Sequence, residues 1–346
     1  MFKDHNQEQQ AGDKSTNLQA QNITVNQGIS YQDAKEIATD VFKNNFLHLS
    51  QKALITAEQR AQELIEDFLI KMNSEKPDSI NSVESPSMQY ALFSAQKEFA
   101  KTGDKDLSDI LVDLLIERSD KEERTLLQIV LDESIEVAAK LTQPQFDVLT
   151  LVFILKYSIN HSLGNLEKLN NYFNTYIIPF CNNLTQENSC YQHLEYANCS
   201  SMLLGGKIGE IFSDNYLGLF SKGFPKIELE NLLGDNANDL IIQCLQNKDL
   251  FQIKALHLNQ LETQLTNLQI SENLKTQIIQ KFKSNVFSII EVENYITQTF
   301  PSLENFIKIW NETMCQVNLT SVGIALGRAN FKRKTGINLD LSIWIK

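Results

Sequence analysis

Glycine and proline are scarce in this chain, with 13 and 6 among its 346 residues. Sandwiches and barrels of short strands need a turn every few residues and use both residue types heavily, so this composition argues against them. Leu, Ile, Gln, Asn, Lys and Glu are abundant instead, and apolar residues recur at steps of three and four over most of the chain, as they do on helices. We therefore predict a mainly α fold, a multi-helix bundle with short β-strands at the N- and C-termini.

Long apolar runs are also missing. No stretch reaches the roughly 18–20 residues that a membrane-spanning helix needs, and the longest candidate, Val148–Leu155, has the length of a core helix. The first ten residues, Met1–Gln10, are polar and lack the apolar segment of an export signal. The five cysteines are an odd number and widely scattered, which fits reduced thiols better than a disulfide framework. We expect a cytoplasmic protein, and binding to a membrane surface stays open.

Positive charge is in deficit. The chain has 31 Lys and Arg against 43 Asp and Glu, a net charge of −12, which argues against general nucleic-acid binding because phosphate attraction needs a cationic face. The deficit is concentrated in residues 1–150, where we count 26 acids and 15 bases, a balance of −11. Residues 151–346 hold the remaining 17 acids and 16 bases. One half of the chain is therefore acidic and the other nearly neutral.

A local basic cluster near the C-terminus consists of Arg328, Lys332, Arg333 and Lys334. It is our candidate anion-docking site, for a phosphate or an anionic lipid surface. Two other interpretations stay open. The cluster could meet the acidic first half of a second subunit, or it could be solvated and stabilise the last turn of a helix.

Motifs that carry chemistry are absent. The sequence holds no G-x-S-x-G nucleophile elbow and no G-x-x-x-x-G-K-[ST] phosphate loop. One cluster has zinc-type residues: Cys181, Cys190, His193 and Cys199. On a helix, Cys199 lies roughly opposite Cys190 and His193, so these residues do not converge on a metal. We predict no catalytic residue, no metal and no cofactor, and we favour a protein that is not an enzyme while leaving that question open.

A row of acids marks the helix expected over residues 105–118. Asp106, Asp109, Asp113 and Glu117 lie on one side of it. Paired carboxylates can bind magnesium or transfer protons. Consecutive acids on one helix, without a facing Glu or His motif, are more typical of a solvated face, which is the interpretation we favour.

The pattern divides the chain into four segments. Residues 1–29 are a polar leader with a short β-strand, and residues 30–73 are one long helix that we expect to be a stalk or an oligomer interface. Residues 74–87 are rich in serine and contain two prolines, so they are predicted to be a linker. Residues 88–346 form a helical domain that ends in a short β-strand.

Both terminal strands are predicted from the alternation of apolar and polar residues. A lone strand in front of helices leaves its backbone groups unpaired, so it must pair with another strand of this chain or with a neighbouring subunit. We therefore predict a homo-oligomer. The apolar strand residues would carry its contacts: Leu18, Ile23, Val25, Leu339, Leu341, Ile343 and Ile345.

Several stretches resemble known sequences. The segment GDKSTNLQ at residues 12–19, followed by NITVN at 22–26, resembles a GD-x-ST-N-x-Q leader found in front of bacterial proteins, many of them associated with phage defence. Other stretches are similar to an uncharacterised bacterial family: SCYQHLEYA at 189–197, LTSVGIA at 319–325, KRKTG at 332–336 and DLSIWI at 340–345. The resemblance implies a bacterial cytosolic protein in a defence-like setting, and it implies no reaction.

Three functions from different classes fit these observations. The first is a non-enzymatic, self-assembling anti-phage defence protein that acts as a sensor or scaffold, with a phage protein as a candidate trigger. The second is a membrane-damaging abortive-infection effector, in which apolar residues such as Leu149–Ile159 become exposed. The third is a metal-dependent hydrolase or nuclease, in which the acids of Asp106–Glu117 bind magnesium. We favour the first.

Overall fold

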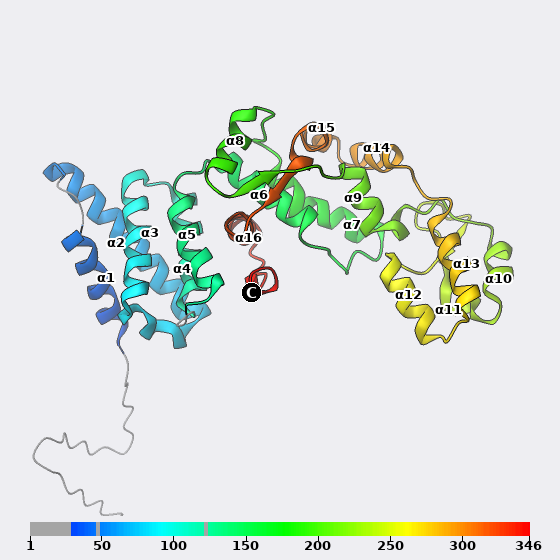
Figure 1. Ribbon diagram of the computed structural model, residues 1–346, viewed down its shortest axis with the longest axis horizontal. Coiled ribbons are helices and arrows are strands. Elements are labelled where there is room, and N and C mark those ends of the chain that lie inside the picture. The colour runs from blue at the N-terminus through cyan, green and yellow to red at the C-terminus, as the bar shows by residue number, and fades with distance from the viewer. Residues whose placement is uncertain (1–28, 46–48, 121–123) are drawn as a thin grey trace, which may run out of the picture.

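The computed structural model describes residues 29–45, 49–120 and 124–346. Within these ranges the chain is mainly helical, with sixteen α-helices and four short strands, which confirms the predicted fold class. The chain forms an arch of three groups of elements (Figure 1). The described parts of residues 31–138 make one end, residues 217–286 make the other, and residues 139–216 and 287–346 lie between them. No helix in the described ranges is long and apolar enough to cross a membrane.

The first group packs five helices around an apolar core: α1 (Tyr31–Asn45), α2 (Gln51–Glu75), α3 (Pro86–Thr102), α4 (Lys105–Ser119) and α5 (Leu126–Ala138). The single helix expected over residues 30–73 is thus two helices, and they pack against each other. Burial accounts for the difference. Helix α1 places Ala34, Ala38 and Phe42 in the interior beside α2 and α3, whereas a straight continuation of α2 would leave them in solvent.

The predicted linker at residues 74–87 is largely a 3-10 helix, Pro77–Glu84, which contacts the first four helices of this group. Its Val83 is buried in the core. Both prolines begin helices, because their fixed φ suits the first helical turn. Before Pro86, the side chain of Ser85 accepts a hydrogen bond from the backbone N–H of Met88 at 3.2 Å. The segment is a packed connection.

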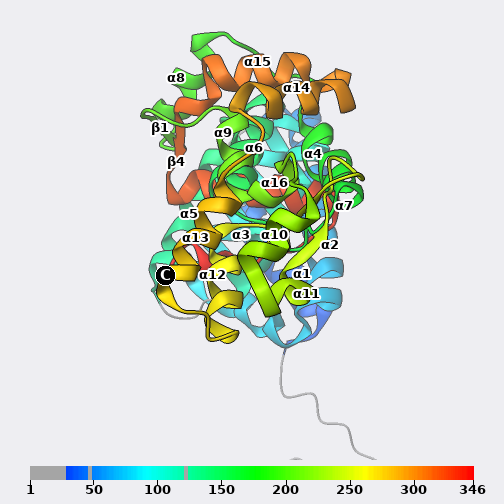
Figure 2. The ribbon, with the colours of Figure 1, turned by 90° about the vertical axis from the view of Figure 1, so that its right-hand side faces the viewer.

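The middle group contains two strands that pair antiparallel, β1 and β4, and two single turns that follow α7. Figure 2 shows α14 and α15 lying above α6 and α16. The elements are α6 (Gln143–Lys156), α7 (Leu166–Tyr172), a π turn (Phe173–Ile177), a 3-10 turn (Ile178–Phe180), α8 (Asn188–Tyr196), β1 (Ser200–Met202), α9 (Ile208–Asn215), α14 (Ile289–Thr299), α15 (Glu304–Glu312), β4 (Val317–Leu319) and α16 (Ser321–Thr335).

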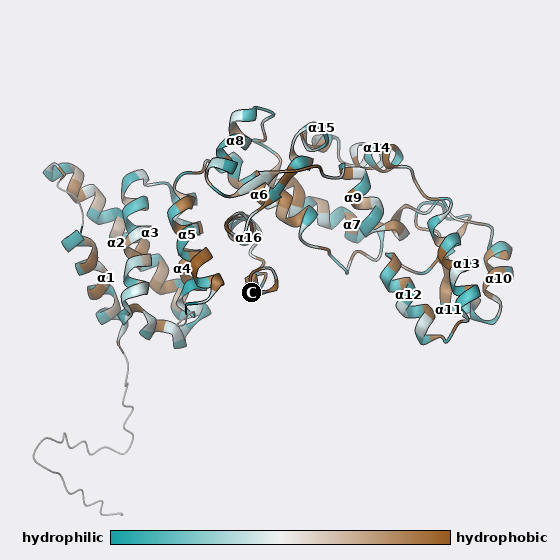
Figure 3. Cartoon of the chain, in the orientation of Figure 1, coloured by the Kyte–Doolittle hydropathy of each residue, from teal (hydrophilic) through white to brown (hydrophobic). Residues whose placement is uncertain are grey.

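Helices α6 and α16 form the centre of this group. Residues 145–155 of α6 and 322–332 of α16 are all buried, and α6 is among the most apolar segments in Figure 3. The two backbones approach closely at Gly327, where an added Cβ would lie 2.7 Å from the carbonyl oxygen of Leu149. The hydroxyl of Thr150 donates to the carbonyl oxygen of Gly327 at 3.0 Å. A residue without a side chain permits this contact.

The third group has an apolar core of its own. Its elements are α10 (Lys226–Leu233), α11 (Ala237–Leu240), α12 (Leu258–Asn267), α13 (Glu272–Lys283) and the antiparallel strands β2 (Ile241–Gln243) and β3 (Phe251–Ile253). Its 3-10 turns are Leu217–Phe220 and Gly234–Asn236, and further short 3-10 turns in the middle group are Pro301–Leu303, Met314–Gln316 and Leu341–Ile343.

The strand expected at the C-terminus is not formed, because residues 341–343 make a 3-10 turn. A turn places Leu341 and Ile345, four residues apart, on one side, and both are buried against the rest of the chain. The indole N–H of Trp344 donates to the carbonyl oxygen of Tyr157 at the end of α6, at 2.8 Å. Packing on α6 thus explains the apolar alternation without a strand. The strand predicted at the N-terminus lies outside the described residues.

Candidate functional site

The basic cluster lies in the second half of α16, and it faces the acidic side of α4. The buried guanidinium of Arg328 donates through Nη1 to Oδ2 of Asp113 at 2.5 Å and through Nη2 to Oε1 of Glu117 at 2.6 Å. Its Nε donates to the carbonyl oxygen of Leu339 at 2.8 Å. One side chain therefore joins α16, α4 and the C-terminal segment.

Asp113 is the shared partner of three cations. Besides Arg328, Nζ of Lys332 lies 2.7 Å from Oδ1 of Asp113, and Nζ of Lys71 lies 3.3 Å from it. Lys332 also forms an ion pair with Glu75 of α2 at 2.7 Å. Burial lowers the pKa of Lys332, but the charges and hydrogen bonds of Asp113 and Glu75 outweigh it, so this pKa stands above its usual value. The lysine is held in its charged form at the junction of three helices.

The other two cations of the cluster are paired as well. Arg333 forms an ion pair with Asp106, and Nζ of Lys334 lies 2.8 Å from Oδ1 of Asp147 on α6. The structure thus corrects the anion-docking expectation for Arg328, Lys332, Arg333 and Lys334. Carboxylates of the same chain neutralise all four, so they are not displayed to a phosphate. The same pairing corrects the solvated-face interpretation for Asp113 and Glu117, which are largely buried, whereas Asp106 and Asp109 are exposed.

Asp109, the remaining acid of the row on α4, lines a cleft of about 440 Å³ together with Asp67 of α2. Burial raises the pKa of Asp109, although Arg333 and Lys71 partly offset that effect. Burial and the charge of Asp109 likewise raise the pKa of Asp67. Perturbed carboxylates mark functional sites or structural ion networks. Here the cleft mixes carboxylates with cations, and among the described residues no group of three or more His, Cys, Asp or Glu is placed to hold a metal.

The cysteines and histidine that we weighed as zinc ligands are occupied in packing. Burial raises the pKa of Cys199 to about 12 and also raises the pKa of Cys190. Protonated thiols are weak nucleophiles and weak metal ligands. Nδ1 of His193 lies 2.9 Å from the side-chain nitrogen of Gln145.

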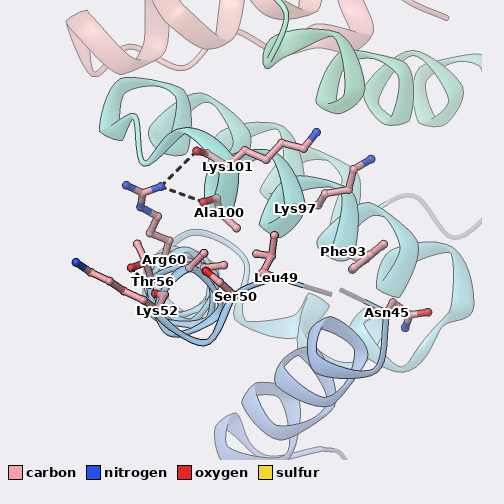
Figure 4. A pocket seen from close by; sticks show the side chains of 12 residues that line it. Asn45, Leu49, Ser50, Lys52, Thr56, Arg60, Phe93, Lys97, Ala100 and Lys101 are labelled. Carbon is pink, nitrogen blue, oxygen red and sulfur yellow. Dashed lines mark hydrogen bonds between the residues drawn. The ribbon is translucent and has the colours of Figure 1, made fainter. Parts of the chain in front are cut away.

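An open groove of about 880 Å³ lies where the end of α1, the beginning of α2 and the end of α3 meet. In Figure 4, Leu49 and Phe93 lie near its middle, and lysine and arginine side chains stand around it. Among the described residues it is lined by Asn45, Leu49, Ser50, Lys52, Ala53, Thr56, Ala57, Arg60, Phe93, Lys97, Ala100 and Lys101. Sequence reasoning missed this groove, because three separate segments build it and none carries a motif.

An apolar turn between β1 and α9 is the second exposed feature that the sequence did not reveal. Its Leu203 and Leu204 are 63% and 99% exposed. The backbone N–H of Leu203 donates to the carbonyl oxygen of Gln316 at 2.8 Å. Gly205, which follows Leu204, lies so close to the carbonyl oxygen of Cys315 that an added Cβ would be 1.8 Å from it. The turn is therefore held firmly while it presents two leucines to solvent.

The residues predicted to carry subunit contacts lie in three kinds of place. Leu341 and Ile345 are buried within their own chain, so a neighbouring subunit cannot contact them in the folded state, which corrects that expectation. Leu339 is half-buried, and Ile343 is 62% exposed. The remaining three lie outside the described residues: Leu18, Ile23 and Val25.

Fold and sites together define a mainly α-helical protein with an internal ion network, an open groove and an exposed apolar turn. The chain belongs to an uncharacterised protein family, whose model matches residues 28–345. The match spans the central and C-terminal stretches on which the family resemblance was based. No curated protein and no solved structure matches the chain.

Proposed function

We propose that this protein is a non-enzymatic, self-assembling scaffold or sensor in bacterial defence against phage. The observation that carries the proposal is the turn at Leu203 and Leu204, which keeps two adjacent leucines in solvent. Burying such surface against a partner gains about 25 cal/mol per Å². Ordering the turn on contact costs little conformational entropy, because the indole N–H of Trp310 already donates a hydrogen bond to the carbonyl oxygen of Gly206 at 3.2 Å.

The defence setting of this proposal comes from the resemblance of residues 12–19 to a leader that accompanies phage-defence proteins. A protein in that role needs a contact surface more than it needs a reaction. The apolar turn supplies such a surface, and the arch places it on the middle group, at a distance from both ends (Figure 1). A phage protein is the trigger that we propose.

The two alternative functions have less support. A membrane-damaging effector must release an apolar helix, but residues 148–155 of α6 are buried throughout and covered by α16. A magnesium-dependent hydrolase needs carboxylates that face a common point, but Asp106, Asp113 and Glu117 are each paired with an arginine of α16. The first alternative requires breaking the packing of α6 on α16 within the middle group. The second requires breaking ion pairs between the first and middle groups.

Light scattering across a range of protein concentrations tests the assembly. We expect the wild-type chain to form a particle larger than one subunit and the double variant Leu203→Asp with Leu204→Asp to be monomeric at the same concentration. Ile227→Asp on α10 is the matched control, because Ile227 is 63% exposed, as Leu203 is. A wild-type chain that is monomeric at every concentration, or an equal loss of mass in the control, would contradict the proposal.

Phage plating on a bacterial host that expresses the chain alone tests the role. We expect protection relative to an empty vector, and we expect it to be lost both in the double leucine variant and in a chain that lacks residues 1–28. Full protection by a double variant that light scattering shows to be monomeric would separate defence from assembly and sink the scaffold mechanism.

A further inference from the structure

We propose that the groove between α1, α2 and α3 binds an amphiphilic anion: a free small molecule with one apolar chain or ring and a single carboxylate, sulfate or phosphate group. The volume of about 880 Å³ lies in the range of small-molecule sites. Figure 4 shows the groove between the helices of the first group. This inference concerns that group alone and does not depend on self-assembly.

The groove exists because small side chains face one another where α2 passes α1 and α3. Ala57 of α2 and Ala100 of α3 are buried in a small core beside it, and Ala53, one turn before Ala57, lines it. Among the described residues around the groove, these methyl groups leave the space between the helices unfilled. Leu49 and Phe93 present apolar surface to that space. Covering this surface with an apolar ligand removes it from water and so favours binding.

Cations surround the apolar part of the groove. Lys52, Arg60, Lys97 and Lys101 line it, and none of its described lining residues carries a carboxylate. Arg60 is fixed in place, because its Nη1 donates to the carbonyl oxygens of Ala100 at 3.0 Å and of Lys101 at 3.3 Å. The whole chain has a net charge of −12, so this local surplus of positive charge makes an anionic group the complementary ligand.

Neighbouring side chains leave part of that positive charge unbalanced. Glu98 stands outside the groove, 3.4 Å from Nζ of Lys97 and 3.0 Å from Nζ of Lys101. Lys52 lies in the first turn of α2, which contains no acid, and the N-cap residue Ser50 makes no hydrogen bond through its side chain. The partial positive charge of a helix N-terminus adds to that of Lys52.

Both halves of the ligand are required by the lining. An inorganic phosphate would leave Leu49 and Phe93 in water, and a neutral apolar molecule would leave the surplus positive charge of the lining without an anion. A bilayer surface is flat, whereas this groove is recessed between three helices (Figure 4). A single amphiphilic molecule with an anionic head therefore fits best.

Titration calorimetry with three probes of equal chain length tests the inference: decanoate, decyltrimethylammonium and decyl maltoside, each below its micelle concentration. The probes share an apolar chain and differ in the charge of the head. We expect decanoate to bind the full chain at least about tenfold more tightly than the other two. Equal binding of all three, or no binding of decanoate, would overturn the proposal. So would binding to phosphatidylglycerol vesicles without binding to monomeric decanoate.

Two variants assign the binding to the groove. Lys52→Glu is expected to weaken decanoate binding at least about fivefold, whereas Lys248→Glu, the same charge change at an exposed lysine between β2 and β3, leaves it unchanged. Ala53→Trp fills the groove from an exposed position and is expected to abolish binding while the circular dichroism spectrum stays that of the wild type. Wild-type affinity in either Lys52→Glu or Ala53→Trp would place the binding elsewhere and refute the assignment.

Discussion

Arg328 and Asp113 are separated by 215 residues, yet Nη1 of the arginine lies 2.5 Å from Oδ2 of the aspartate, and their side chains are only 1% and 2% exposed. The pair connects α16 in the middle group with α4 in the first group. Glu117 and Lys332 add their charges to it. A buried ion without its partner keeps its desolvation cost, so this contact constrains how the two groups pack.

Replacing Arg328 by Met is expected to lower the free energy of unfolding by about 3–5 kcal/mol, because Asp113 would keep its buried charge with one fewer partner. Urea denaturation measures the loss. Lys226→Met is the control, because the ion pair of Lys226 with Glu230 is exposed and such pairs contribute about 0–1 kcal/mol.

The double variant Arg328→Met with Asp113→Asn makes this prediction sharper. Removing both charges should cost less than the two single changes added together, because no carboxylate is then left without its arginine. Additive losses, or a loss below about 1 kcal/mol for Arg328→Met alone, would contradict the buried pairing.

The charged faces of α4 and α16 could be predicted from sequence, but their meeting could not. Asp106 and Asp113 share a helix face by spacing alone, and so does the pair Arg328 and Lys332. A solvated face, a contact with a second subunit and an internal ion network all have the same local pattern. Only the long-range packing of α16 distinguishes them.

Helix positions were predictable where the signal is local, as at Gly103, which ends α3 with a φ of +64°. The groove had no local signal. In the sequence, Ala53 and Ala100 do not differ from other helical alanines. The space between them arises only when three helices converge. The C-terminal alternation was misleading for a related reason: Leu341 and Ile345 are buried in a turn as readily as in a strand.

Gly327→Ala is expected to destabilise the protein by about 1–3 kcal/mol. Alanine favours a helix over glycine by about 1 kcal/mol, but here the new methyl group would lie 2.7 Å from the backbone oxygen of Leu149, so the steric term wins. Gly164→Ala, outside any helix, is the control for the steric effect, because an added Cβ there meets nothing within 4 Å. Thermal unfolding of both variants gives the comparison, and a more stable Gly327→Ala protein would disprove the close helix contact.

Trp344→Ala tests whether the C-terminal segment stabilises its own chain. The indole N–H donates to the carbonyl oxygen of Tyr157, and the ring meets Phe153 edge-on at a centroid distance of 4.9 Å. We expect a loss of about 3–5 kcal/mol in unfolding free energy for Trp344→Ala and about 1 kcal/mol for Trp344→Phe, which keeps an aromatic ring at this position and loses the hydrogen bond. The mass from light scattering should stay unchanged. A lower mass at unchanged stability would instead indicate that this segment contacts a neighbouring subunit.

His161 and His257 meet where the third group joins the middle group, with Nδ1 of His161 3.2 Å from Nε2 of His257. Nδ1 of His257 accepts the backbone N–H of Gln260 as the N-cap of α12. Neutral His257 therefore carries its proton on Nε2 and donates it to Nδ1 of His161. A proton added to Nδ1 of His161 would set its N–H against the N–H on Nε2 of His257. A proton added to Nδ1 of His257 would remove the acceptor that caps α12.

This arrangement predicts a loss of stability in mild acid. Burial lowers the pKa of His257, and His161 lowers it further. The unfolded chain then binds the proton more readily than the folded chain, so this contribution is complete above the unfolded value of 6.5 and declines as the pH falls through it. His257→Asn keeps a capping side chain and has no imidazole to titrate. Urea midpoints at about pH 7.5 and about pH 5.5 should therefore fall further in the wild type than in the variant. Because the carboxylates titrate alike in both proteins, an equal fall would show that the histidine pair does not contribute.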